Sequence, residues 1–475
     1  MSIRKIAFWG AGLAVLGVSL VGGAFFLMKA HFNPAPPDPG FGKPANALEA
    51  QRQDLEQLRR LVALDRSYPA AGRAAANALI DTLAKDTKVL SWAQMRVTAM
   101  RAAALADNGH TSAYSGDNRR PNAVPLMVTG FSDGFYVLRA KAPFADLLGA
   151  RVEAIDGQPI EAVLAKLDAL HGGLPAWRRY GSITWLSSPE ILNAAGIAPS
   201  PDASTWTLRL RNGSVVTRAL KAETLDPKGS YEEPSRWMSP EPLDKESKDW
   251  RALGVALPLP LRDFNRTFRR RWLGKSCVLF AQMKAVVDGP DEKIGGWLDA
   301  TMDEMAARKP CALILDMRYN TGGDYTNTWA FTHKLSALLQ PGGRVFILTG
   351  VQSFSATITT IAFIKEQLGD RAVIIGEPVG DRLKFLSEGN SGCLPNSGIC
   401  FHYSTGMHDY SAPCTDWQVC YWLNWLYPVR VRTLAPDETV HESFADYLSG
   451  RDPVFERAVA DAARSVNPPL VLTQY

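Results

Sequence analysis

Apolar and polar positions follow a different period in each successive region of the chain. From residue 46 to about residue 106, apolar residues recur at near-helical spacing, as Leu55 and Leu58 do. That spacing predicts helices with one buried face. Between residues 124 and 220 the pattern changes to alternating positions and tight turns, including Asn212-Gly213 between two strand-like runs. Alternation around such a turn predicts a small β-rich module built from hairpins.

From about residue 253 onward, short apolar runs alternate with helical segments. The apolar runs are of the buried-strand type, and they lie at 278–281, 312–315, 345–348 and 372–375. The helical segments between them lie at about 291–308, 325–339 and 356–368. Strands that alternate with helices predict an α/β layer with a mainly parallel sheet. Ligand sites in such sheets lie beyond the carboxyl ends of the strands.

The N-terminal segment has a pattern of its own. Residues 6–28 are uncharged and mostly apolar, and they follow Arg4 and Lys5. A helix of that length spans a hydrocarbon core of ~30 Å, and the segment lacks a good signal-peptide cleavage site. We therefore predict an uncleaved, single-pass anchor in the cell inner membrane. The cationic start predicts that everything after Lys29 lies in the periplasm or extracytoplasmic space.

These patterns divide the chain into consecutive parts. They are a transmembrane anchor at 1–29, a proline-rich spacer at 30–45, a helical domain at 46–120, a β-rich module at 121–225, a charged linker at 226–252, and an α/β domain at 253–475 with a cysteine-rich insertion at 391–420. The predicted fold class is therefore α/β, with an N-terminal transmembrane helix, a small helical domain and a β-rich module before a mainly parallel sheet.

Composition narrows the range of partners. Apolar residues make up 46% of the chain and charged residues 21%, which is ordinary for a globular protein. The net charge of +4 arises from 52 basic and 48 acidic residues. This balance is too mild to favour nucleic acid, so we expect no nucleic-acid partner.

Cysteine usage indicates an oxidising compartment. Four of the six cysteines fall in the insertion at 391–420, namely Cys393, Cys400, Cys414 and Cys420. Such a cluster favours disulfides, and three pairings of the four are open. The spacing lacks the Cys-x-x-Cys signature of structural zinc, so we expect no metal, with a site that uses His402 and His408 as a minor alternative. Cys277 and Cys311 are either buried thiols or a third bridge.

Two turns that follow predicted parallel strands carry residues suited to chemistry. The turn after the strand at 312–315 contains Gly322 and Gly323, whose backbone N–H groups can be aimed at an anion. After the strand at 345–348, Ser355 stands at the start of a helix, beside first-turn N–H groups that include that of Ala356. A serine at a helix start is most often only a cap.

The two turns, in this order, resemble those of the tail-specific (C-terminal-processing) serine peptidase family and of its relative, the tricorn core protease. The segment Leu315-Asp-Met-Arg-Tyr-Asn-Thr-Gly-Gly is similar to that family's Asp-Leu-Arg-x-Asn-x-Gly-Gly turn. Ser353-Phe-Ser-Ala-Thr is similar to its Ser-Ala-Ser-Ala-Ser element, and further similar segments follow at 373–378, 435–440 and 450–455. The β-rich module stands where the family inserts its peptide-binding PDZ domain, so we expect it to be PDZ-like.

The resemblance implies a serine-peptidase site. Ser355 aligns with the nucleophile, and a serine hydroxyl needs a base to take its proton. The N–H groups of Ala356 and of Gly322 or Gly323 then form the oxyanion hole for the tetrahedral intermediate.

The general base has several candidates, and the sequence leaves the choice open. The lysine slot of the tail-specific family holds Asp381 and Arg382 here, and Lys384 stands two residues late; arginine stays protonated and cannot be a base. The tricorn type uses a histidine of the helical domain, and His110 stands in the matching place. His408, in the cysteine-rich segment, is a further candidate, because disulfides hold such a loop rigidly. The acid that would orient a histidine is not assigned.

The sequence therefore predicts a membrane-anchored extracytoplasmic serine endopeptidase that hydrolyses peptide bonds in envelope polypeptides, with no cofactor. The alternative is a catalytically inactive binding or scaffolding protein of the cell envelope that keeps the peptidase fold. The displaced lysine and the unassigned acid favour that alternative. A serine esterase is disfavoured, because the residues around Ser355 lack the Gly-x-Ser-x-Gly elbow. The oligomeric state is left open.

Overall fold

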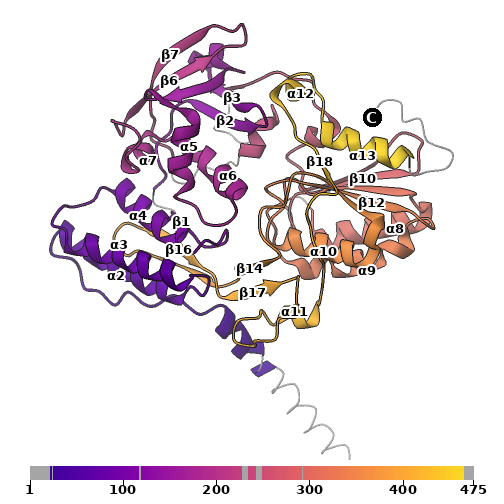
Figure 1. Cartoon of the computed structure of the whole chain (residues 1–475), viewed down its shortest axis with the longest axis horizontal. Helices are drawn as coiled ribbons and strands as arrows, with labels where there is room; N and C mark the ends of the chain where they lie inside the picture. Colours follow the sequence, from indigo (N-terminus) through magenta and orange to yellow (C-terminus); the bar gives the residue numbers. More distant parts are fainter. Residues whose placement is uncertain are drawn as a thin grey trace, which may run out of the picture.

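The computed structural model describes residues 22–23, 25–116, 119–226, 234–241, 249–290 and 292–464. In Figure 1, the helical region and the β-rich module lie on one side of the molecule, and the α/β domain lies on the other. Strands β14 and β17 run between the two sides.

The helical region is formed by α2 (Ala47–Leu64), α3 (Ala70–Lys85) and α4 (Trp92–Ala104). Leu55 and Leu58 of α2 are buried, as their spacing predicts. Ser91 and Gln94 form a capping box at the start of α4, in which each side chain bonds the other residue's backbone N–H.

The β-rich module is an antiparallel sheet with short helices inserted between its strands. The sheet order is β2 (Leu126–Phe131), β3 (Gly134–Lys141), β4 (Arg151–Ile155), β6 (Ala203–Arg209) and β7 (Val215–Lys221). Strand β5 (Gln158–Pro159) pairs with β4, and β8 (Trp250–Ala252) pairs with β3. The inserted helices are η1 (Ala142–Leu147), α5 (Ile160–Asp168), α6 (Pro175–Trp185) and α7 (Pro189–Ala194).

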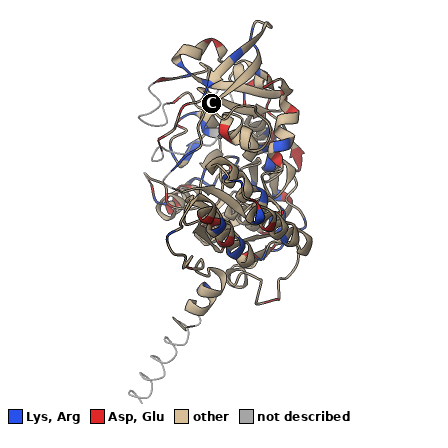
Figure 2. Ribbon diagram, turned by 90° about the vertical axis from the view of Figure 1, so that its left-hand side faces the viewer, with Lys and Arg blue, Asp and Glu red and all other residues tan. Residues whose placement is uncertain are grey.

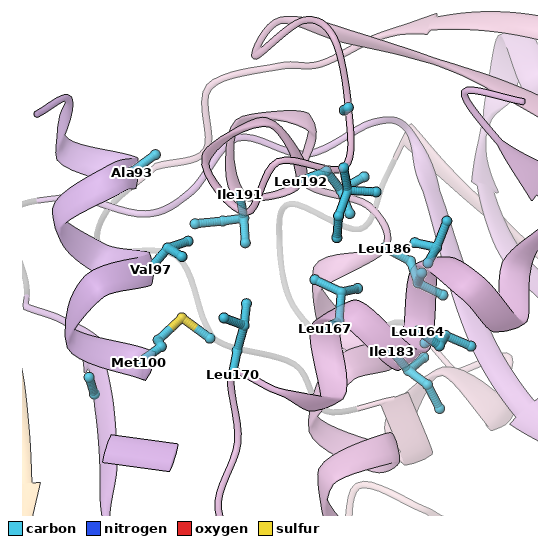
Figure 3. Close-up of a cluster of buried hydrophobic side chains, with 14 of the residues drawn as sticks. Ala93, Val97, Met100, Leu164, Leu167, Leu170, Ile183, Leu186, Ile191 and Leu192 are labelled. Carbon is cyan, nitrogen blue, oxygen red and sulfur yellow. The ribbon is translucent and has the colours of Figure 1, made fainter. Parts of the chain in front are cut away.

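The helical region and the β-rich module share one hydrophobic core. Val97 and Met100 of α4 face side chains of α5 to α7, among them Leu167 and Ile191 (Figure 3). Burial of apolar surface stabilises by about 25 cal/mol per Å², so separating the two parts would expose this surface at a cost. The helical region and the β-rich module therefore pack against each other.

The α/β domain is built on a sheet with the order β18-β13-β12-β11-β10-β9. Its strands are β9 (Phe268–Trp272), β10 (Val278–Met283), β11 (Ala312–Asp316), β12 (Arg344–Thr349), β13 (Ala372–Gly376) and β18 (Glu438–Thr439). Neighbouring strands are parallel except for β9, which is antiparallel to β10. The predicted alternation of strands and helices is therefore present.

Helices cover both faces of this sheet. One face carries α8 (Ile294–Arg308), α9 (Trp329–Leu338) and α10 (Ala356–Leu368), and the other carries α13 (Pro453–Arg464) (Figure 1). Adjacent strand residues therefore enter different cores: Leu313 packs with α8 to α10, and Ile314 packs with α13. Shorter helical turns complete the chain: η2 (Pro234–Met238), η4 (Leu259–Leu261), η5 (Tyr325–Thr328), η6 (Gly369–Arg371), α11 (Leu423–Leu426) and α12 (Phe444–Leu448).

Two hairpins connect the α/β domain with the helical region. Strand β14 (Lys384–Ser387) pairs with β17 (Gly406–Asp409), and between them β15 (Asn390–Cys393) pairs with β16 (Ile399–Tyr403). Strand β16 also pairs with β1 (Ser112–Ser115), which follows His110 in the chain. The hairpins therefore bring the His110 segment close to the α/β domain.

The six cysteines form disulfides, which confirms the expectation of disulfide bonding. The pairs are Cys277–Cys311, Cys393–Cys400 and Cys414–Cys420. The first pair joins the residues that precede the neighbouring strands β10 and β11, and the second crosses the β15–β16 hairpin. Disulfides of this kind are typical of proteins from oxidising compartments.

The predicted transmembrane helix and the single-pass inner-membrane localisation are corrected by the structure. Within the residues described above, no helix combines the length and the apolar character that a membrane crossing needs. Residues 1–21 and 24 of the expected anchor lie outside the described residues. At the described end of that segment, Phe25 lies edge-on to Trp422 at 5.7 Å between ring centroids, while Phe25, Phe26 and Leu27 are exposed.

Charged residues are interspersed over the molecule (Figure 2). The densest basic run, at residues 266–271, overlaps β9, and two of its arginines have partners within the α/β domain. Arg269 donates to the Gln282 side chain, and Arg270 pairs with Glu304 at 2.9 Å. These arginines therefore hold the strand to its neighbours.

Candidate active site

Ser355 lies in a strained turn between β12 and α10. Its φ is 55° and its ψ is −128°, a backbone conformation that costs a non-glycine residue of the order of 1–3 kcal/mol. Ser355 occupies the N-cap position of α10, but its side chain makes no capping hydrogen bond. The serine is therefore not held there as a helix cap, and its hydroxyl is left free at the end of a parallel strand.

The glycine turn after β11 lies directly against this serine. Gly322 has a φ of 111°, and a Cβ atom added to it would lie 2.7 Å from the Ser355 Cβ atom. Only glycine fits this approach, because such a contact is closer than real Cβ atoms allow. The Asn320 side chain ties the turn together by accepting from the Gly322 N–H at 3.0 Å, and its backbone carbonyl accepts from the Phe354 N–H at 3.1 Å.

The backbone donors of the site differ in availability. The Gly322 N–H is already bonded to the Asn320 side chain. Within the described part of the chain, no hydrogen bond uses the N–H of Gly323 or of Ala356, the first residue of α10. Gly323 and Ala356 line the same cavity as Ser355, and unoccupied backbone N–H groups in such a place can stabilise an oxyanion.

A buried ion-pair network lies next to the glycine turn in the sequence and fixes the residues that precede it. Arg318 pairs with Asp316 at 2.9 Å and with Asp452 at 2.7 Å, and all three side chains are nearly fully buried. Burial alone would lower the pKa of Arg318, but Asp316 and Asp452 outweigh it and raise that pKa well above its usual range. Asp452 belongs to the segment at 450–455, so this network joins two of the motifs that the sequence singled out.

Ser355 opens into a cavity of about 240 Å³. The cavity is lined by Gly323, Asp324, Tyr325, Ser355, Ala356, Thr359, Phe385, Ser387, Glu388, His408, Tyr421 and Leu423. It therefore combines the candidate nucleophile, the free N–H groups and one of the candidate bases.

His110 lies beside the nucleophile turn, between two phenylalanine rings. Its ring stacks on Phe354, the residue before Ser355, at 4.4 Å and on Phe385 at 5.2 Å. Its Nδ1 atom lies 3.5 Å from Oδ2 of Asp381, whose side chain is completely buried. Among the described residues, neither ring nitrogen of His110 nor this carboxylate oxygen has a hydrogen-bond partner. His110 and Asp381 thus face each other, and Nε2 of His110 is available.

The other two candidate bases are placed differently. His408 lines the Ser355 cavity, but its Nδ1 atom is within hydrogen-bond distance of Tyr410 and Asn424, at 3.2 and 3.1 Å. Its Nε2 atom lies 3.3 Å from Glu388 Oε1. The side chain of Lys384 is 60% exposed, 3.8 Å from an Asp409 oxygen. A lysine acts as a base where burial favours its neutral form, and Lys384 lacks that environment.

The structure of the chain has known counterparts. No protein-family model matches the sequence, and no curated protein matches it. The structure of mature CPAF complexed with lactacystin is 13% identical, with a TM-score of 0.57 over 89% of this chain and 99% of that one. A second structure of mature CPAF gives a TM-score of 0.56 at 13% identity, over 90% of this chain and 99% of that one.

The chain has the fold of mature CPAF. The photosystem II D1 C-terminal processing protease is a weaker match, with a TM-score of 0.36 and 10% identity over 82% of this chain and 93% of that one. The likeness to known structures is therefore one of fold, and it rests on the two CPAF structures. At such low identity the site chemistry has to be argued from the residues of this chain.

Reasoning from the sequence missed two features of the site. Asp381 was noted only as a residue in the lysine slot, although a carboxylate in place of the base was itself a signal. The contact of Phe354 with both His110 and Trp177 left no signal in the sequence, because it joins three distant segments; the Trp177 and Phe354 rings stack at 3.9 Å.

Proposed function

We propose that this protein is an extracytoplasmic serine endopeptidase that hydrolyses peptide bonds in polypeptides, with Ser355 as the nucleophile. One observation carries the proposal. Ser355 sits at a strained helix start with an uncapped side chain, beside two unoccupied backbone N–H groups and open to a cavity. A serine that only caps a helix needs none of these features. The disulfides support an extracytoplasmic location.

His110 is the proposed general base, oriented by Asp381. Asp381 Oδ2 faces Nδ1 of His110 at 3.5 Å and would accept its proton once the pair closes, which would leave Nε2 to take the proton from the Ser355 hydroxyl. Such contacts are often loose without substrate and tighten when it binds. His408 and Lys384 are poorer candidates, because Nδ1 of His408 is held by Tyr410 and Asn424 while its Nε2 faces Glu388, and because Lys384 is exposed.

The proposed reaction proceeds in two stages. Ser355 attacks the scissile carbonyl, and its proton passes through His110 to the leaving amine. The N–H groups of Gly323 and Ala356 hold the negative oxygen of the tetrahedral intermediate. Water then attacks the acyl-enzyme while His110 takes its proton, and His110 passes that proton to the Ser355 oxygen as the carboxylic acid product leaves.

Labelling with a fluorophosphonate tests the nucleophile directly. The full-length protein is treated with the probe, and we expect labelling that Ser355→Ala abolishes. Ser449→Ala removes an exposed serine far from the site in sequence and should label normally. Because CPAF has been described in complex with lactacystin, pretreatment with lactacystin is a second probe, expected to block the same serine.

The same experiment decides between an enzyme and a binding protein. A wild-type protein that never labels and cleaves no denatured casein would refute the peptidase and leave a peptidase-fold binding protein.

A further inference from the structure

The Ser355 cavity is acidic. Among the described residues that line it are two carboxylates, those of Asp324 and Glu388, and no lysine or arginine. Asp324 lies at the exposed rim, where its Oδ1 atom accepts from the N–H of Thr326 at 2.9 Å. Glu388 lies deeper, with 24% of its side chain exposed. The cavity therefore favours a group of positive charge.

Glu388 is held in the cavity at a conformational cost. Its φ is 57°, which is unfavourable for a residue with a long side chain. Gly389 follows, and a Cβ atom at that position would collide with the Tyr403 carbonyl oxygen. The turn is thus forced by close packing, and it directs the Glu388 carboxylate toward the residues that line the cavity.

Within the described chain, the Glu388 carboxylate has no lysine or arginine partner. Its Oε1 atom lies 3.3 Å from His408 Nε2 and accepts from the Ser387 hydroxyl at 3.4 Å. Tyr421 also lines the cavity, and its pKa is raised by burial first and then by the charges of Glu388 and Asp324. Both carboxylates therefore contribute negative charge to the same cavity. A partly buried carboxylate is stabilised most by a cationic partner.

The walls of the cavity suit a long, flexible cation. Tyr325, Phe385 and Tyr421 provide aromatic surface. Aromatic faces pack against the methylene stem of lysine or arginine and attract its charged end. A short apolar side chain would leave the Glu388 carboxylate without a new partner.

We propose that this cavity is the pocket for the side chain on the acyl side of the scissile bond, and that Glu388 selects lysine or arginine there. Ser355, Gly323 and Ala356 line the same cavity, so a carbonyl held by the two N–H groups places its own side chain inside it. The inference rests on the proposed function and adds the substrate class: polypeptides cleaved after a basic residue.

Paired peptides test this selectivity. Two fluorogenic peptides differ only at the residue before the scissile bond, which is lysine in one and norleucine in the other. A site with a buried polar group that binds a polar group of the substrate discriminates strongly against an analogue that lacks that group. We expect kcat/KM to be at least about 30-fold higher for the lysine peptide, and Glu388→Gln to reduce that ratio about tenfold or more. Glu56→Gln, on the surface of α2, is the matched control and should keep the ratio.

The possible outcomes separate this inference from the proposed function. A protein whose Ser355 labels with fluorophosphonate, but which cleaves both peptides equally or neither, overturns the basic selectivity and leaves the nucleophile in place. A Glu388→Gln variant that slows both peptides by the same factor also overturns it, because Glu388 then acts in the chemistry and not in selection. Absence of labelling in the wild type refutes the proposed function itself.

Discussion

Asp381 and His110 come from segments far apart in the chain, yet the carboxylate lies 3.5 Å from the imidazole in a site closed to solvent. If Asp381 orients the base, Asp381→Asn should lower kcat about 100-fold or more and leave KM nearly unchanged, because general-base catalysis contributes 10²- to 10⁴-fold. His110→Ala should slow fluorophosphonate labelling at least as much. Steady-state kinetics and labelling rates measure both effects.

The matched controls for this prediction are at the rival base. Lys384→Ala and Lys384→Gln both alter the exposed lysine of β14 and should change kcat less than threefold. If Lys384→Ala suppresses labelling more than His110→Ala does, the histidine assignment is wrong.

Individual residues of the site were predictable only where a motif carried them. Ser355 and the glycine turn lie in segments that resemble family motifs, and His110 stands at the position of the tricorn histidine. The choice between Gly322 and Gly323 was not predictable, because it depends on the Asn320 side chain that occupies one N–H and leaves the other free. Backbone N–H direction is set by φ and ψ, which the residue type of a glycine does not restrict.

At the level of elements, the loop between α4 and β1 is held by a buried carboxylate. Asp65, at the end of α2, is fully buried; its Oδ2 atom accepts from the Thr111 hydroxyl at 2.6 Å and from the Ser404 N–H at 3.0 Å. Burial raises the pKa of Asp65, although hydrogen bonds from Ser67, Thr111 and Ser404 oppose this shift. Asn108 donates to the Ser404 hydroxyl at 3.0 Å. The residues on both sides of His110 are thus fixed by this network.

Removal of the Asp65 carboxylate should therefore destabilise the folded protein. We expect Asp65→Ala to lower the free energy of unfolding by about 2–5 kcal/mol, because several buried donors lose their acceptor. Urea denaturation followed by circular dichroism measures this loss. Asp81→Ala removes an exposed partner of Arg59 and should cost less than about 1 kcal/mol. Equal losses for the two variants would contradict a special role for the Asp65 network.

Local elements were predictable to the extent that local sequence determines them. The helix expected at 356–368 is α10, and the buried runs lie in β10 to β13. The sheet of β1, β16 and β15 was not predicted, because it pairs Ser112 with His402. No local pattern contains the partner of such a strand, and register across that separation is set by packing.

At the scale of the whole molecule, the predicted membrane anchor was wrong for an instructive reason. Hydrophobic length predicts a span, yet no helix of the described residues has the length and apolar character for one. At the described end of the segment, Phe25 contacts Trp422. A sliding window counts apolar residues, and long-range contacts of this kind lie outside it.

The β-rich module contacts the active site through a column of stacked rings. Trp177 of α6 stacks on Phe354 at 3.9 Å, Phe354 stacks on His110 at 4.4 Å, and His110 stacks on Phe385 at 5.2 Å. Asp107 reinforces the junction, because it pairs with Arg178 of α6 and with Arg382, next to Asp381. One module thus supports the position of the base and of the nucleophile turn together.

Trp177 should therefore be a positioning residue for catalysis, although it belongs to a different module from Ser355. We expect Trp177→Ala to slow fluorophosphonate labelling of Ser355 about tenfold while the protein remains folded. Phe354 would lose the ring that it stacks on, and His110 stacks on Phe354 in turn. Displacing a catalytic group by 1 Å lowers the rate by up to about 100-fold. Trp177→Phe keeps an aromatic face and should restore most of the rate, a result that a merely stabilising contact would not require. Trp417→Ala, at a site where 59% of the side chain is exposed, is the control for loss of a tryptophan. If both alanine variants label at the wild-type rate, the β-rich module does not support the site through these stacked rings. If the melting temperature of Trp177→Ala falls below the assay temperature, the slow labelling is due to unfolding and the positioning role is rejected.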